Sequence, residues 1–138
     1  MSLTFDGLDT LIEDMSDLAN LPDDVIDEML EAAIDVVLDA QYKKGIAYGV
    51  HRTGDTLKSL EKSEPREIPK GNGRCAFVYF DGKNPDGNRN AEVAFINEFG
   101  KEGQPARPFI RDAVEECADK SIEAAAQVYD NFLKTKRF

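Results

Sequence analysis

The sequence predicts an α+β protein in which two long amphipathic helices pack on a small, mostly antiparallel β-sheet of about three to four strands. Apolar residues recur every three or four positions over residues 22–48 and again over residues 108–135, which is the spacing of one helix face. Between them, residues 64–95 hold short apolar runs bounded by glycine, proline and asparagine, a pattern typical of strands and turns. A length of 138 residues, 41% of them hydrophobic, suits a single domain over residues 1–138.

The first expected element is a short amino-terminal helix within residues 1–20, because apolar residues between Phe5 and Leu18 lie three or four positions apart. The long helix over residues 22–48 follows, with Asn20 as its cap and Pro22 in its first turn, where the missing N–H of proline costs nothing. At 1.5 Å per residue this helix would be roughly 40 Å long. It would overhang a small sheet and offer surface to another subunit.

After that helix, residues 55–60 predict one or two further helical turns. Residues 65–69 and 74–80 then predict a β-hairpin closed by the glycine-containing turn over residues 70–73. Apolar side chains alternate on both faces of the second strand. We therefore expect both faces of this strand to be covered.

Residues 81–89 form a polar loop that is too long for a tight hairpin. Residues 91–94 are expected to be a third strand that leads into a helical turn at residues 95–99, which Gly100 can terminate. The second long helix, over residues 108–135, ends in basic residues, as suits the negative end of the helix dipole.

The loop before the last helix is stiff, because Pro105 and Pro108 each fix their own backbone and bias the preceding residue to extended geometry. Arg107, which lies between them, would present a permanent positive charge from an ordered turn. From the residues alone, two interpretations stay open. The segment is either a turn that leads into a helix and carries a surface arginine, or a contact site for a partner.

The negative charge is concentrated at one end of the chain. Residues 1–42 hold twelve acidic side chains and no lysine or arginine, whereas residues 43–138 hold fifteen acidic and seventeen basic ones, which gives −12 and +2. Such a field repels nucleic acid and attracts basic partners over a range of about 8 Å at physiological salt. A well-solvated helix surface explains the same charges equally well.

Few residues offer chemistry. His51 is the only histidine and has no acidic or cysteine partner at a recognisable spacing, and the two cysteines, Cys75 and Cys117, are expected to be free thiols. Carboxylates are abundant, but no spacing singles out a pair for acid–base work, and no glycine-rich phosphate loop, basic stripe or long apolar run is apparent in the sequence. We expect no catalytic activity, cofactor, bound metal, membrane span or sequence-specific binding of nucleic acid.

Two segments carry a family resemblance. Residues 97–100 read Asn-Glu-Phe-Gly and are followed at residues 105–110 by Pro-Ala-Arg-Pro-Phe-Ile. Upstream, residues 52–60 read Arg-Thr-Gly-Asp-Thr-Leu-Lys-Ser-Leu, similar to a Thr-Gly-x-Leu-x-x-Ser pattern but with one extra residue after Gly54. Together they resemble the gene-product-ten-like family of tailed phages and prophages, whose members are head–tail joining, neck, tail-completion or minor tail proteins.

The resemblance implies a non-enzymatic virion protein, assembled in the bacterial host cytoplasm and located at the head–tail junction or in the tail. Its implied partners are copies of itself, arranged in a ring, and the neighbouring connector, terminator or tail proteins. An acidic lumen in such a ring would let DNA slide through without gripping it.

The resemblance and the stiff loop together nominate residues for two roles. The expected partner-binding residues are Arg52, Thr53, Gly54, Ser59, Glu98, Gly100, Pro105, Arg107 and Pro108. The expected core anchors are Leu57, Phe99 and Phe109. Among the first group, the two arginines are expected to touch the partner directly, because a guanidinium group suits carboxylate recognition.

Two other classes of function stay open. A small ligand-binding or hydrolytic α+β protein would hold its site between the sheet and the loop over residues 81–89. An acidic adaptor would instead use the amino-terminal helices against a basic partner protein.

Overall fold

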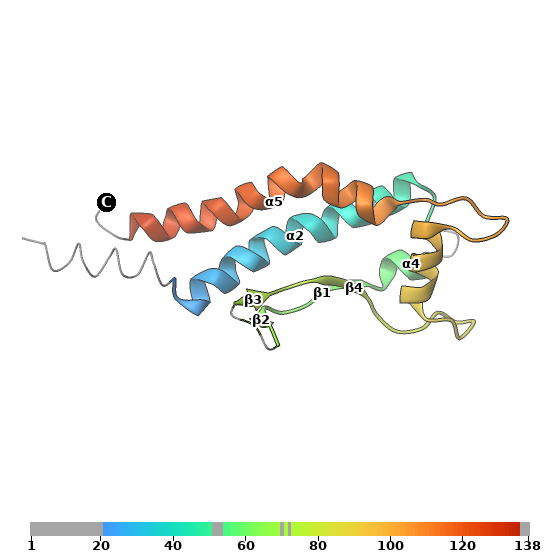
Figure 1. The fold of residues 1–138 in the computed structure, drawn as a ribbon, viewed down its shortest axis with the longest axis horizontal. Coiled ribbons are helices and arrows are strands. Elements are labelled where there is room, and N and C mark those ends of the chain that lie inside the picture. The colour runs from blue at the N-terminus through green and yellow to red at the C-terminus, as the bar shows by residue number, and fades with distance from the viewer. Residues whose placement is uncertain (1–20, 51–53, 70, 72, 136–138) are drawn as a thin grey trace, which may run out of the picture.

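The computed structural model describes residues 21–50, 54–69, 71 and 73–135. Two long helices run antiparallel, a ribbon of strands lies along one of them, and two short helices gather at one end (Figure 1). The fold class is therefore α+β, as predicted. The amino-terminal helix expected within residues 1–20 lies outside the described residues.

The two long helices match the predicted ranges to within one residue. Helix α2 spans Asp23–Ala47 and helix α5 spans Phe109–Lys134. Helix α2 lies between α5 and the strands, so α5 packs mainly on α2 (Figure 1). Pro22 occupies the position before α2 and makes no side-chain cap, and Asn20, the predicted cap, is not among the described residues.

The short helices are α3, Asp55–Lys58, and α4, Asn90–Phe99. The expected strand over residues 91–94 is wrong, because these residues form the first turns of α4. The buried residues of α4 recur every four positions, at Asn90, Ala94 and Glu98, which is a helical period and not the two-residue period of a strand. This buried face consists of one small alanine and two polar residues, so the sequence shows no apolar pattern that would reveal it.

The strands form two antiparallel pairs instead of one continuous sheet. Strand β2, Arg66–Glu67, pairs with β3, Arg74–Cys75, and this is the predicted hairpin. Strand β4, Val78–Phe80, pairs with β1, Leu60–Lys62, so that Leu60 lies opposite Phe80. Strand β1 precedes the predicted strand region and was not anticipated.

The hydrophobic core lies at one end of the helix pair, where α3, α4 and the start of α5 meet the end of α2. Its buried members are Val50, Leu57, Ala94 and Phe109. Phe80 packs against Phe109 edge to face, with ring centroids 6.1 Å apart. The expected core positions of Leu57 and Phe109 are confirmed.

Gly45 lets α2 approach α3 closely. A Cβ atom on Gly45 would lie 2.4 Å from Cδ2 of Leu57, so a side chain at this helix position would displace the leucine. Gly45 is therefore a packing residue within α2, and the helix continues past it to Ala47.

The described residues leave one face of the strand ribbon open. Phe77 and Tyr79 are both exposed and pack edge to face on each other, and Arg66 lies over the Phe77 ring. The expectation that both faces of this strand are covered is therefore wrong for the described chain. Only the face that carries Val78 and Phe80 is turned toward α2 and the core.

Both cysteines are free thiols, as predicted. Cys117 is buried on α5, and burial raises the pKa of its thiol, whereas Cys75 is half-buried. Among the described residues, no helix is both long enough and apolar enough to cross a membrane.

Replacing Phe109 with Ala should lower the free energy of unfolding by about 3–5 kcal/mol, because the side chain is fully buried and its loss leaves a cavity. Urea denaturation followed by circular dichroism measures this change. Ile122→Ala, at a position 66% exposed on the same helix, should change stability by less than about 0.5 kcal/mol. Similar losses in the two variants would show that the core is not concentrated around Phe109.

Candidate docking surface

The strongest candidate site is the corner made by α4, residues 100–108 and the first turn of α5, which we call the docking corner. Its turn depends on Gly100, which has a φ of 77°. A Cβ atom there would lie 2.8 Å from both the Gln104 carbonyl oxygen and the Ala106 nitrogen. Gly100 therefore meets a backbone requirement, since a side chain would both strain φ and collide with main chain.

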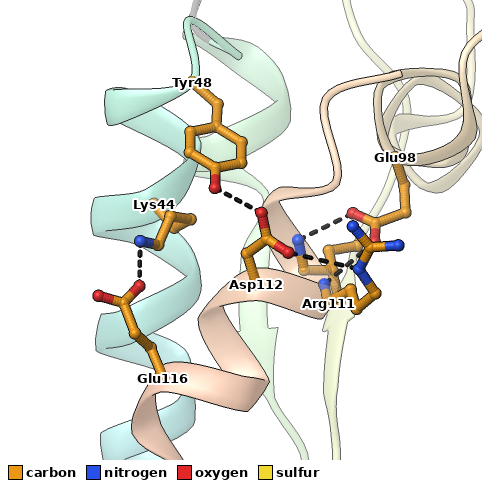
Figure 2. Close-up of polar contacts among 7 residues, drawn as sticks. Lys44, Tyr48, Glu98, Arg111, Asp112 and Glu116 are labelled. Carbon is orange, nitrogen blue, oxygen red and sulfur yellow. Dashed lines mark hydrogen bonds and ion pairs between the residues drawn. The ribbon is translucent and has the colours of Figure 1, made fainter.

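A buried carboxylate holds α4 to α5. Glu98 is only 8% exposed, and its Oε2 and Oε1 accept hydrogen bonds from the backbone N–H groups of Ile110 and Arg111, at 2.8 and 3.0 Å (Figure 2). The negative charge lies at the positive end of the helix dipole. Glu98 was expected to bind a partner, but its carboxylate is used inside the chain, where it caps α5.

The other N–H groups of this helix end bond to backbone carbonyls. The Phe109 N–H donates to the Arg107 carbonyl at 2.7 Å, and the Asp112 N–H donates to the Pro108 carbonyl at 3.0 Å, which is the first hydrogen bond of the helix itself. Because Pro108 has no N–H, these bonds and the two bonds to Glu98 satisfy every donor of the first turn. The corner is consequently a closed hydrogen-bonded unit.

Arg107 joins the corner to the end of α2. Its backbone N–H donates to the Asn97 carbonyl at 2.6 Å, and its Nη1 donates to the Gly49 carbonyl at 3.1 Å. The side chain is nevertheless exposed, as the sequence predicts. Pro105 is exposed and Pro108 is half-buried, so this part of the loop offers surface to a partner.

Phe99 is not a core anchor. It is 67% exposed, and Phe95, one turn earlier on α4, is 61% exposed. The two rings pack on each other with centroids 4.7 Å apart, and we call them the aromatic pair. The prediction failed because the inward face of α4 carries Asn90, Ala94 and Glu98, which leaves the phenylalanines on the outward face.

The upstream motif is partly described. Gly54 precedes α3 with a φ of 80°, Leu57 is buried in the core, and the Ser59 hydroxyl donates to the Thr56 carbonyl at 2.6 Å. Gly54 and Ser59 thus have internal backbone roles. Arg52 and Thr53, which were expected at the partner, lie outside the described residues, as does His51.

A polar seam joins α2 to α5 beside the corner. The Tyr48 hydroxyl donates to Oδ2 of Asp112 at 2.5 Å, and Lys44 forms an ion pair with Glu116 (Figure 2). The hydrogen bond from Tyr48 lowers the pKa of Asp112, and the same bond raises the pKa of the tyrosine. Sequence reasoning missed this seam, because no local pattern links residues 64 positions apart.

The described surface has several hollows, of which two concern the candidate sites. One is a groove between α2 and α5, which we call the α2–α5 groove, and it encloses about 370 Å³. It is lined by Val36, Asp39, Ala40, Lys43, Lys44, Ala47, Ala113, Glu116, Cys117 and Lys120. The other lies on the open face of the strand ribbon, beside Arg66, Phe77 and Tyr79. Residues 81–89, where a ligand-binding or hydrolytic protein would hold its site, line neither hollow.

No family model, curated protein or solved structure matches the chain. Within the described part of the chain, no three histidine, cysteine, aspartate or glutamate residues are grouped so that they could hold a metal ion. The docking corner and its aromatic pair are therefore a candidate site on the basis of their geometry alone.

Replacing Glu98 with Ala should lower the free energy of unfolding by about 1–3 kcal/mol, because two N–H groups of α5 lose a charged acceptor. Glu98→Gln keeps one acceptor oxygen and should cost less. Urea denaturation of each variant measures the effect. Glu102→Ala, an exposed carboxylate on the same corner, is the matched control and should be nearly neutral. Equal effects at both positions would remove the capping role.

Tyr48→Phe should destabilise the protein more at about pH 7 than at about pH 3. The folded pKa of Asp112 is lowered, so its bond with Tyr48 stabilises fully above the unfolded pKa of roughly 3.9 and is lost as pH falls through the folded pKa. Denaturation of wild type and variant at both pH values measures this difference. A difference that does not depend on pH would contradict the assignment.

Proposed function

We propose that this chain is a non-enzymatic assembly protein of a tailed phage or prophage, which joins head to tail or completes the tail through ring-like protein–protein contacts. The observation that carries the proposal is the aromatic pair, Phe95 and Phe99, exposed on a helix that is locked to α5. The proposed location is the virion, after assembly in the bacterial host cytoplasm.

Exposed aromatic rings on a rigid support are typical of protein-binding surfaces. Aromatic residues are enriched at interfaces, and a few of them carry most of the binding energy. Fully burying a phenylalanine side chain is worth about 1.5–3 kcal/mol. Phe95 and Phe99 together could therefore drive a substantial contact if a partner covered them.

The rigidity of the docking corner lowers the cost of such a contact. Gly100 fixes the turn, Glu98 caps the helix that follows, and Arg107 ties the loop to α2. A surface that is already ordered loses little conformational entropy when a partner binds. This arrangement suits a component that must present one shape repeatedly around a ring.

The sequence resemblance supports the same function, because its stronger motif supplies the residues that build the corner. Glu98, Gly100, Arg107 and Phe109 each have a distinct structural part in it. The motif therefore describes how the corner is made, while the contact surface is formed by the phenylalanines that the corner holds outward.

A second candidate, an acidic adaptor for a basic protein, rests on a row of exposed carboxylates along α2. Five acidic residues follow one face of this helix, namely Asp24, Glu28, Glu31, Asp35 and Asp39. Lysines already pair with two of them, since Lys62 lies against Asp35 and Lys43 against Asp39. The same row would suit the lumen of a ring through which DNA slides.

Deleting the gene from the phage or prophage that carries it should abolish plaque formation and leave heads and tails unjoined or tails incomplete in electron micrographs. Wild-type protein supplied from a plasmid should restore plaques. Arg107→Ala should stay folded by circular dichroism yet fail to restore them, because the corner loses both an exposed guanidinium and its bond to the Gly49 carbonyl.

Arg89→Ala is the matched control for this complementation. Arg89 is also exposed, and its side chain forms a long ion pair with Glu92, at 3.8 Å and three residues along the chain. It should restore plaque formation. Normal virions after the deletion would refute the assembly function, and full rescue by Arg107→Ala would remove Arg107 from the contact.

A further inference from the structure

We propose that the aromatic pair of one copy inserts into the α2–α5 groove of a second copy, giving a head-to-tail contact between identical chains. This inference rests on the proposed function, because it names the partner of the docking corner. The knob is Phe95 with Phe99, and the receiving surface is the groove around Ala40, Ala47 and Ala113.

The knob is an outward projection that the described part of its chain leaves uncovered. Phe95 and Phe99 are more than half exposed, and they form a single tilted pair with centroids 4.7 Å apart. Their helix is anchored on its other side by Ala94 and Glu98. None of the described residues buries these rings, so they are free to meet a second copy.

The groove has a size and lining that suit rings of this kind. Small side chains, Ala40 and Ala47 on α2 and Ala113 on α5, leave the space between the helices, with Cys117 buried beside them. Its volume of about 370 Å³ is at the small end of ligand pockets, which span roughly 300–1,000 Å³. Two side chains on one helix fit this scale better than a large ligand does.

Charged side chains of both signs line the rim of the groove. Lys43 pairs with Asp39 and Lys44 pairs with Glu116, whereas Lys120 is an exposed lysine at the groove. A lysine ammonium is attracted to the negative face of an aromatic ring, so Lys120 can approach an incoming ring. Among the described residues such pairing of a cation with a ring occurs twice, since Lys44 lies 5.6 Å from the Tyr48 ring centre and Arg66 lies 4.7 Å from that of Phe77.

The knob and the groove are different surfaces of one chain, which determines the kind of assembly. When one copy fills the groove of the next, its own groove stays open for a third copy. Contacts of this heterologous type close into a ring when the rotation between copies allows it, and otherwise extend as a filament. A symmetric pairing of two knobs would stop at a dimer.

Photo-cross-linking tests the contact with the purified full chain. Phe99→p-benzoylphenylalanine keeps an aromatic ring at the knob. This variant is mixed with wild-type protein labelled with ¹⁵N. The protein concentration is about 1 mM, so that a weak complex is populated. After irradiation, mass spectrometry should detect cross-links between residue 99 and labelled peptides that contain residues 36–47 or 113–120. Tyr79→p-benzoylphenylalanine, at an exposed ring on the strand ribbon, should not label these peptides.

A second measurement tests the rim. The double variant Lys43→Glu with Lys120→Glu should raise the dissociation constant for self-association about tenfold in sedimentation experiments. Lys134→Glu, an exposed lysine at the far end of α5, should leave it unchanged. Each of three results would overturn the inference. They are the detection of monomers alone at this concentration, cross-links between two knobs, and an unchanged dissociation constant for the rim variant.

The outcomes separate this inference from the proposed function. Cross-links in the groove combined with normal virions after gene deletion would keep the contact and reject the assembly function. Defective virions without groove cross-links would keep the function and reject this contact, leaving the aromatic pair to a different partner.

Discussion

The buried carboxylate of Glu98 is the interaction on which the rest of the docking corner depends. It satisfies two N–H groups at the start of α5, and it fixes the end of α4 against that helix. Without it, an ordered helix end would be left with buried donors, each of which is costly to leave unpaired. These two bonds hold the start of α5, where Phe109 enters the core, against the end of α4, whose outward face carries the aromatic pair.

The hydrogen bonds of Glu98 also explain how a short motif can specify a surface. Gly100 permits the turn after α4, and Arg107 returns the loop to the carboxyl end of α2 through the Gly49 carbonyl. Each residue solves a local problem of backbone conformation or hydrogen bonding. The surface that results presents the exposed rings of Phe95 and Phe99 together with the exposed guanidinium of Arg107.

The sequence predicts the helices well, because the stripes of α2 and α5 are long and their period is clear. It fails at α4, where alanine and polar residues form the buried face and the large apolar side chains point outward. The same reversal misplaces Phe99 in the core and Glu98 at the surface. Periodicity alone could not show this, since the fate of Glu98 is decided by N–H groups 12 and 13 residues later.

The position of the core at one end of the molecule has a mechanical consequence. Phe109, Leu57 and Val50 concentrate burial near the docking corner, whereas the opposite end of the α2 and α5 pair relies mainly on half-buried side chains (Figure 1). Local opening should therefore begin at that far end, and amide hydrogen exchange should slow progressively toward the corner. The pair of long helices is therefore held more firmly at the docking corner than at its far end.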